Sequence, residues 1–269
     1  MARRGSRRRS RPTERKAEGT GIADFLLREI FILDMLRAAG ATLLLTAASM
    51  PLAVVFGLAL AAMRISHRRM LSWPAATYIE VIRGTPLLVQ LFVVYYTLPQ
   101  LGNYLQTDLL PRIGVCLETN PLTWNNWAVG IFCLSANYAA YEAEILRAGL
   151  QAIDPGQREA ALSLGMSERQ AFFIIVLPQA FRVVVPPIIN DLIAMLKDSC
   201  LVSVIGVPEL LFKANGIGKA RATVAQMLTV AAALYLTLSL GGYALGRLLE
   251  KRLSIRGAPE LHVDQPHGH

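Results

Sequence analysis

Several stretches of this sequence are apolar and uncharged for about the length of a membrane-spanning helix. No charged residue occurs between Ala38 and Met63, and residues 222–246 are equally free of charge. A helix needs roughly 20 apolar residues to cross a bilayer. Hydrophobic residue types make up 54% of the chain and charged types 17%, which is too apolar for an ordinary soluble domain. We therefore predict an all-α membrane protein.

Charged residues fall inside two of the predicted spans. The second reaches spanning length only if it includes Glu80 and Arg83, and the fourth contains Asp191, Lys197 and Asp198. Ionisable groups at the bilayer centre are costly, so we expect them to face a pathway or a partner. The five predicted spans are 38–63, 78–101, 124–141, 188–207 and 222–246.

The segments outside the spans differ in character. Residues 1–20 form an Arg-rich tail, and residues 254–269 form a polar C-terminal tail with scattered histidines; we expect both to be disordered. Between the first tail and the first span, apolar residues recur at helical spacing among charged ones. We predict an amphipathic helix at 21–37 that lies at the membrane interface, followed by a transmembrane domain at 38–253.

The positions of Lys and Arg predict which side is cytoplasmic. With five spans, one set of loops and the C-terminus hold twelve Arg and Lys residues, and the opposite loops hold four. The positive-inside rule then places the loop 142–187 inside and the N-terminus outside. The basic tail would then lie outside, against the rule. Either the tail is an exception, or the true start codon lies further along the sequence, or the number of spans is wrong. The tail carries +6 of the formal charge of +8, so the body is nearly neutral and nucleic-acid binding is not expected.

The long cytoplasmic loop contains the signals of a short helix. Asp154 can cap a helix, Pro155 suits its first position, and Gln157 stands where the partner of a capping box belongs. Gly165 then ends the helix at a position that favours a left-handed residue.

A second helix is predicted directly after this corner. Ser167 and Gln170 form another capping box ahead of an apolar run. A helix-turn-helix DNA reader has a similar shape, but Arg169 is the only basic residue in the second helix before Arg182, too little for phosphate binding. Two packed surface helices, or a helix pair presented to a soluble partner, remain as interpretations.

The corner resembles the EAA signature of the membrane permeases of bacterial ABC importers. Two more stretches, residues 83–90 and 196–201, are similar to permeases of the histidine, glutamine and opine group, although Cys200 replaces the more usual Ser. The likeness covers about residues 20 to 255. The residues that match the EAA signature are Glu159, Ala160, Ala161, Gly165, Ile175, Leu177 and Pro178.

This resemblance implies a five-span permease of the type I ABC importer fold in the bacterial inner membrane. The elbow around Gly165 would dock on a separate cytoplasmic ATPase, which would bind ATP and Mg, and Glu159 would meet a basic group there or else stabilise its own helix. No Walker-type loop occurs in this chain, so we expect that the chain is not itself an enzyme and that it has no cofactor of its own. The implied partners are ATPase subunits, a second permease and a periplasmic amino-acid-binding protein. A permease for another small polar solute, or a stand-alone secondary transporter, is the alternative.

Charged and helix-breaking residues near the second and fourth spans mark a candidate substrate path. Lys197 could face the carboxylate of an amino acid and Asp198 its ammonium group, unless both pair within the protein, for instance with Glu80 or Arg83. No metal site is expected, because the C-terminal histidines are irregularly spaced. The predicted path consists of Arg83, Gly84, Thr85, Pro86, Asp191, Lys197 and Asp198.

Overall fold

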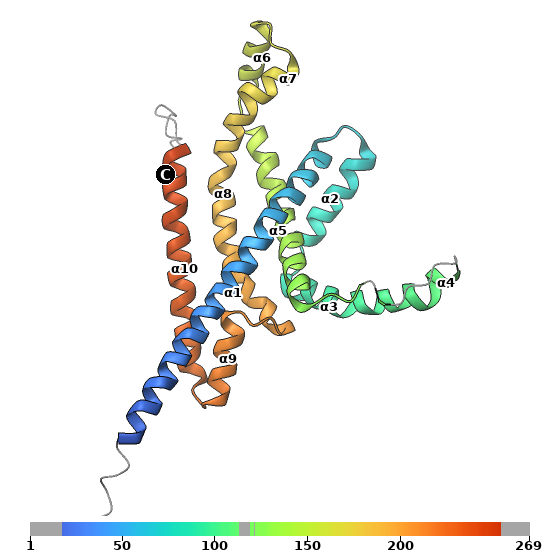
Figure 1. Cartoon of the computed structure of the whole chain (residues 1–269). Coiled ribbons are helices and arrows are strands. Elements are labelled where there is room, and N and C mark those ends of the chain that lie inside the picture. Colours follow the sequence, from blue (N-terminus) through green and yellow to red (C-terminus); the bar gives the residue numbers. More distant parts are fainter. Residues whose placement is uncertain (1–17, 113–118, 121, 254–269) are drawn as a thin grey trace, which may run out of the picture.

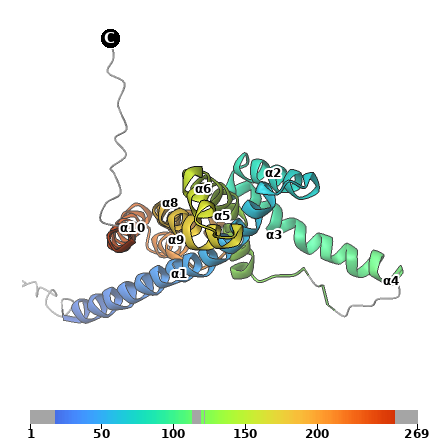
Figure 2. The ribbon, with the colours of Figure 1, turned by 90° about the horizontal axis from the view of Figure 1, so that it is seen from above.

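The computed structural model describes residues 18–112, 119–120 and 122–253, and these residues are helical with short connections and form no strand. The prediction of an all-α membrane protein is confirmed. Four long helices form the body of the molecule (Figures 1 and 2). They are α1 (Glu18–Ile65), α5 (Asn126–Gln151), α8 (Leu177–Asp198) and α10 (Val224–Leu253).

Helix α1 is one unbroken element of 48 residues. The separate interfacial helix predicted at 21–37 is therefore wrong as an element, because these residues continue into the first span. No proline or other helix-breaking residue separates the two parts. Met35 and Ala38 are buried in a cluster with Leu210 and Ala231, from the opposite end of the sequence. The tail predicted at 1–20 lies outside the described residues except for its last three, and the tail at 254–269 lies outside them entirely.

The second predicted span, 78–101, is not a single helix. Helix α2 (Arg69–Arg83) and helix α3 (Leu87–Tyr104) meet at 108°. The reason is local, because Pro86 has no N–H to continue the ladder and disfavours helical geometry in the residue before it. Beyond α3 the chain continues in the same direction through a π-helical turn, Leu105–Leu109, and α4 (Leu110–Arg112).

The fourth predicted span, 188–207, begins too late. Helix α6 (Pro155–Ser163) leads to a corner, and from Glu168 the chain runs as one long helical rod to Ile205. Pro186 and Pro187 lie inside this rod, so Asp191 is in the interior of a helix and not near its N-terminus. Prolines are tolerated in such helices when neighbouring groups satisfy the freed carbonyls. The rod consists of α7 (Glu168–Gln170), a π-helical segment (Ala171–Val176), α8 and a 3₁₀ segment (Ser199–Ile205).

The count of five spans is approximate. Among the described residues, three helices are long and apolar enough to cross a membrane, and the bent pair α2 and α3 would make a fourth. Helix α5 covers all but the first two residues of the predicted span 124–141 and extends ten residues past it. The short helix α9 (Leu210–Ala220) turns the chain back into α10.

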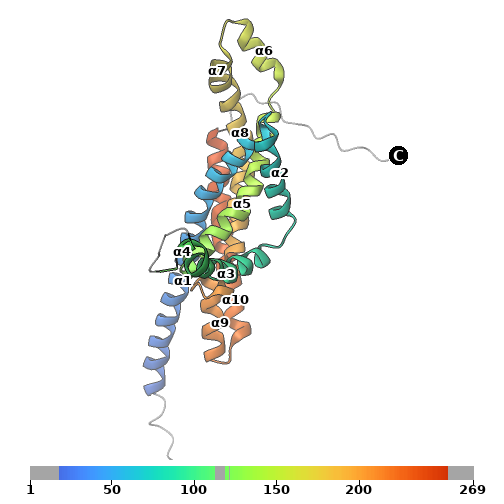
Figure 3. The same cartoon turned by 90° about the vertical axis from the view of Figure 1, so that its right-hand side faces the viewer.

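The two ends of the bundle carry different elements. The α6–α7 corner, the turn between α1 and α2 and the end of α10 lie at one end, while α9 and the start of α1 lie at the other (Figures 1 and 3). Between them, apolar side chains from α1, α3, α5 and α8 form the main core, and Leu45, Leu91, Leu134 and Met195 are almost fully buried there. The loops predicted for one membrane side thus share one end of the molecule.

Candidate functional site

A cavity of about 530 Å³ lies between the α2–α3 break and the facing sides of α5 and α8. Pockets of a few hundred Å³ accommodate small organic molecules. Both walls come from elements that the sequence marked as unusual, the helix break and the charged fourth span. Six of the seven residues predicted for a substrate path line this cavity: Arg83, Gly84, Thr85, Pro86, Asp191 and Asp198.

The helix break forms one wall and is held open by Gln90. The Gln90 Nε2 atom lies 2.8 Å from the Ile82 carbonyl oxygen and 2.8 Å from Thr85 Oγ1. Its Oε1 accepts a hydrogen bond of 3.0 Å from Asn137 on α5. One side chain therefore satisfies a carbonyl that the break leaves free and ties the break to the neighbouring helix.

Two aspartates on α8 form the opposite wall. Asp191 and Asp198 are seven residues apart, which places them on the same face of the helix, two turns from each other. Asp198 Oδ2 accepts a hydrogen bond of 2.8 Å from the Tyr138 hydroxyl. Asp191 Oδ2 is buried and has no hydrogen-bond donor in the described part of the chain. A buried hydrogen-bond acceptor of this kind costs folding free energy unless a donor pairs with it.

The cation of the cavity is Arg83, at the last position of α2. Its guanidinium carbon lies 5.3 Å from the centre of the Tyr141 ring, within the range of a cation–π interaction. Across the described residues Arg83 forms no ion pair. The guanidinium is thus placed and oriented but not neutralised by direct contact.

Lys197 does not join this group. Its side chain is exposed and it does not line the cavity. Adjacent residues on a helix point in different directions, so the neighbouring Asp198 turns inward while Lys197 turns away. Neither forms an ion pair in the described part of the chain, and the suggested pairing of either with Glu80 or Arg83 is absent there.

Several residues of the site were not predicted from the sequence. Asn137, Tyr138 and Tyr141 line the cavity from α5, and their spacing on one helical face, within the predicted span 124–141, was the available signal. Glu142 is 0% exposed and both its carboxyl oxygens lack a partner in the described structure. It packs on α1, where a methyl group at Gly57 would lie 2.6 Å from the Glu142 Cβ.

The elbow between α6 and α7 has the local geometry that its sequence predicts, with one exception. Asp154 caps α6 by accepting a 2.7 Å hydrogen bond from the Gly156 amide. Gly165 has a φ of +85°, in the left-handed region, and Ser167 forms the predicted reciprocal box with Gln170. Gln157 does not complete the first box. Its side-chain Oε1 instead accepts a 3.5 Å hydrogen bond from Gln179 Nε2 on α8.

The elbow presents an apolar surface flanked by charge. Leu164 at its tip is 84% exposed, and Phe173 and Ile174 are 54% and 56% exposed. Arg158 and Glu168 form an ion pair across the corner, which holds the two helices together at their open side. Of the signature residues, Ala161 is buried, Ile175 is half-buried, and Glu159, Ala160, Gly165, Leu177 and Pro178 are exposed.

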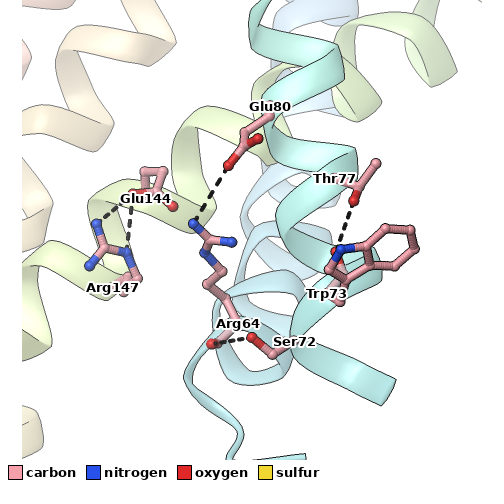
Figure 4. A network of polar contacts seen from close by, with 7 residues as sticks. All are labelled: Arg64, Ser72, Trp73, Thr77, Glu80, Glu144 and Arg147. Atoms are coloured by element: carbon pink, nitrogen blue, oxygen red, sulfur yellow. Dashed lines mark hydrogen bonds and ion pairs between the residues drawn. The ribbon is translucent and has the colours of Figure 1, made fainter. Parts of the chain in front are cut away.

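Polar contacts also stabilise the corner between α1 and α2 (Figure 4). The Ser72 hydroxyl donates a 3.2 Å hydrogen bond to the Arg64 carbonyl oxygen, and Arg64 lies 3.9 Å from Glu80. Nearby on α5, the Arg147 guanidinium donates hydrogen bonds of 2.6 and 3.1 Å to Glu144. The Ser72 and Glu80 contacts join α2, which carries Arg83 at its last position, to the end of α1.

Comparison with known proteins places this geometry in a family context. Residues 53–255 match the family described as the binding-protein-dependent transport system inner membrane component. The arginine transport system permease protein ArtQ of Bacillus subtilis is 36% identical over 223 residues, which cover 83% of this chain and 92% of that protein. The glutamate/aspartate import permease protein GltK of Escherichia coli O157:H7 is 33% identical over 213 residues, which cover 78% and 89%.

Solved structures show the same fold. A crystal structure of an amino acid ABC transporter with histidines superimposes with a TM-score of 0.71 at 36% identity, covering 85% of this chain and 98% of that one. The inward-facing MetNI methionine ABC transporter matches with a TM-score of 0.62 over 84% of this chain, at 17% identity, which supports the fold alone.

Proposed function

Because the chain belongs to the family of binding-protein-dependent transport system inner membrane components, we propose that it is the permease subunit of a bacterial ATP-driven importer for polar amino acids. The names of its relatives support this class, since they include arginine and glutamate/aspartate permeases. It would reside in the inner membrane, and another small polar solute is the alternative cargo.

The observation that carries the proposal is the charge arrangement of the cavity. Arg83 lies in one wall, and Asp191 and Asp198 lie in the other. A free amino acid carries a carboxylate and an ammonium group, so it can meet the guanidinium on one side and a carboxylate on the other. Charge-assisted hydrogen bonds of this kind are stronger than those between neutral groups.

The elbow would connect this cavity to an ATPase. Exposed apolar side chains at a helical corner suit docking into a groove of a soluble subunit, and Glu159 is exposed beside them. ATP and Mg would be bound and used on that separate subunit. A second permease, identical or homologous, and a periplasmic binding protein would complete the assembly.

The long rod from Glu168 to Ile205 provides a means of coupling. It begins at the elbow and carries both Asp191 and Asp198, without an interruption in the helix. A displacement of the elbow by the ATPase would therefore move the acidic wall, while Arg83 remains on α2, which is anchored on α1. The distance between the two walls would change, and the affinity of the cavity for the amino acid would change with it.

Two substitutions test this function in vesicles that contain the complete transport complex. Gly165→Pro cannot adopt the left-handed backbone of the corner, and Glu159→Lys reverses the charge beside the apolar surface. We expect both to abolish ATP-dependent amino acid uptake and to weaken retention of the ATPase during purification. Asp108→Lys is the matched control, since Asp108 is an exposed acid between α3 and α4, helices that lie away from the elbow (Figure 1). Unchanged uptake and ATPase retention in both variants would refute the coupling role.

A further inference from the structure

A second cavity lies away from the candidate site, at the corner between α1 and α2. It has a volume of about 620 Å³, and its lining residues come from the end of α1 and the first two turns of α2. No acidic residue occurs between residues 61 and 79. The cavity therefore combines positive charge with apolar side chains. It is lined by Arg64, Arg69, Met70, Ser72, Trp73 and Ala76.

The positive charge of this corner is only partly balanced within the protein. Arg64 lies 3.9 Å from the exposed Glu80, and its guanidinium donates no hydrogen bond in the described structure. Arg68 and Arg69 are exposed, and neither forms an ion pair in the described part of the chain. Ion pairs between exposed groups are weak, so Arg64 can exchange Glu80 for a stronger anion.

The start of α2 adds to the positive potential of the corner. Arg68 precedes this helix without forming a side-chain cap, and the first turn holds no acidic residue. A helix N-terminus carries a partial positive charge, so Arg68 and Arg69 are placed against the helix dipole. An anion bound beside the two arginines would relieve this repulsion.

Large apolar side chains next to these arginines are turned away from the bundle. Met70 is 89% exposed and Trp73 is 72% exposed. Figure 4 shows the Trp73 ring directed away from Glu144 and Arg147 on α5. Tryptophan is enriched where lipid acyl chains meet the headgroups. An exposed indole beside arginines thus suits the boundary of a membrane better than open water.

The position of the corner indicates which leaflet it meets. The α1–α2 turn lies at the same end of the molecule as the α6–α7 elbow (Figures 1 and 3). The positive-inside rule assigns this end to the cytoplasm. The cytoplasmic leaflet carries anionic lipids and attracts basic groups at its surface.

We propose that the α1–α2 corner is a binding site for an anionic phospholipid of the cytoplasmic leaflet. The headgroup phosphate would lie between Arg64 and Arg69, whose guanidinium groups can donate paired, charge-assisted hydrogen bonds. The acyl chains would run along Met70, Trp73 and Ala76. A soluble anion would contact the arginines but leave the apolar side chains exposed, so the combination favours a lipid. The site is independent of the transported solute.

Fluorescence of a single tryptophan tests the site directly. The chain has three tryptophans, so Trp124→Phe with Trp127→Phe leaves Trp73 as the only indole. Lipids brominated on their acyl chains quench a tryptophan that they contact. The full-length chain in neutral detergent is titrated with brominated phosphatidylglycerol, which is anionic, or brominated phosphatidylcholine, which is zwitterionic. We expect phosphatidylglycerol to quench Trp73 with about 30-fold higher affinity, the effect expected for two arginines.

Substitutions assign this preference to the cavity. Arg64→Gln with Arg69→Gln should reduce it to less than about 3-fold, because neutral amides do not attract the phosphate as guanidinium groups do. The matched control is Arg182→Gln with Arg247→Gln, which removes two exposed arginines on α8 and α10 that do not line the cavity. This control should keep the preference of the parent chain.

Thermal unfolding of the wild-type permease–ATPase complex gives a second readout that needs no tryptophan substitution. Phosphatidylglycerol should raise Tm above the value in phosphatidylcholine with the same acyl chains, since a ligand of the folded state stabilises it. The shift should shrink at high salt, which screens exposed charges. Inorganic phosphate at the same concentration should not reproduce it.

Several results would overturn the proposal. Trp73 quenching that is equal for the two lipids, or absent with both because a second permease or another protein covers the corner, would refute a site for anionic lipid. Protection by inorganic phosphate as strong as that by phosphatidylglycerol would indicate a soluble anion instead. An equal loss of preference in the control variant would assign it to overall charge. None of these results depends on amino acid uptake, so the proposed transport function is tested separately.

Discussion

Replacing Gln90 by leucine tests whether one side chain holds the helix break open. In the structure Gln90 Nε2 lies within hydrogen-bond distance of the Ile82 and Thr85 carbonyl oxygens and of Thr85 Oγ1, and its Oε1 accepts from Asn137. Its two amide hydrogens and its oxygen therefore support three hydrogen bonds. Leucine fills a similar volume but makes none of them.

The expected loss follows from these three bonds. Side-chain hydrogen bonds within membrane proteins contribute on average about 0.6 kcal/mol each, so Gln90→Leu should lower the free energy of unfolding by about 2 kcal/mol. For a chain of this size that corresponds to a fall in Tm of roughly 4–8 °C. Thermal unfolding of the purified protein in detergent measures the shift. Amino acid binding should weaken as well, because Arg83 and Thr85 lose their fixed positions.

Gln100→Leu is the matched control on the same helix. Gln100 is exposed on α3 and forms no side-chain hydrogen bond in the described structure, so its replacement should change stability by less than about 0.5 kcal/mol. If Gln90→Leu and Gln100→Leu unfold at the same temperature, the break does not depend on Gln90 and the argument for that wall is wrong.

Three further substitutions test the rod and the elbow. Gly149→Ala would place a methyl group 2.1 Å from Val184 Cγ1, so it should lower the free energy of unfolding by about 1–3 kcal/mol, measured by thermal unfolding. Adding Val184→Ala in a double variant should restore part of that loss, and no recovery would argue against the α5–α8 contact. Ser167→Ala removes the cap of the rod and should cost about 1 kcal/mol, detected as faster amide exchange at the elbow than in the wild type. Gly165→Ala meets no neighbouring atom but retains a φ of +85°, so it should cost about 1–2 kcal/mol of backbone strain and reduce ATPase coupling without removing it; full coupling would refute the need for a left-handed corner.

The sequence predicted the elements of this fold where the signal is local. The cap at Asp154, the left-handed Gly165 and the box of Ser167 with Gln170 depend on a few neighbouring residues, and all three are confirmed. The EAA signature similarly predicted the family to which the chain belongs. Such features need no knowledge of what packs against them.

The predictions that failed depend on distant contacts. Pro186 and Pro187 usually start or end a helix, yet here they lie within the rod, because α5 and α10 pack against it. The break beside Pro86 has a local cause, but the hydrogen bond that ties it to Asn137 on α5 depends on a contact between distant residues. The sequence also placed Lys197 and Asp198 in the same path, since it does not tell which of two adjacent residues faces inward.

Glu142 illustrates what a linear reading misses. It follows the predicted third span directly and so was counted as the first residue of a cytoplasmic loop. In the structure α5 continues past it, and Gly57 on α1 leaves the space in which it is buried. A pairing between a glycine and a residue 85 positions away has no signature in the sequence.

Simultaneous measurement of amino acid uptake and ATP hydrolysis tests the central claim most directly. The assay uses proteoliposomes that contain this chain with its ATPase partner and an external binding protein loaded with radiolabelled arginine. We predict that arginine accumulates only when Mg-ATP is present on the ATPase side, and that Gly165→Pro abolishes accumulation while the ATPase retains its own hydrolysis. Arginine uptake that proceeds at the same rate without ATP would contradict the account and would identify the chain as a stand-alone transporter.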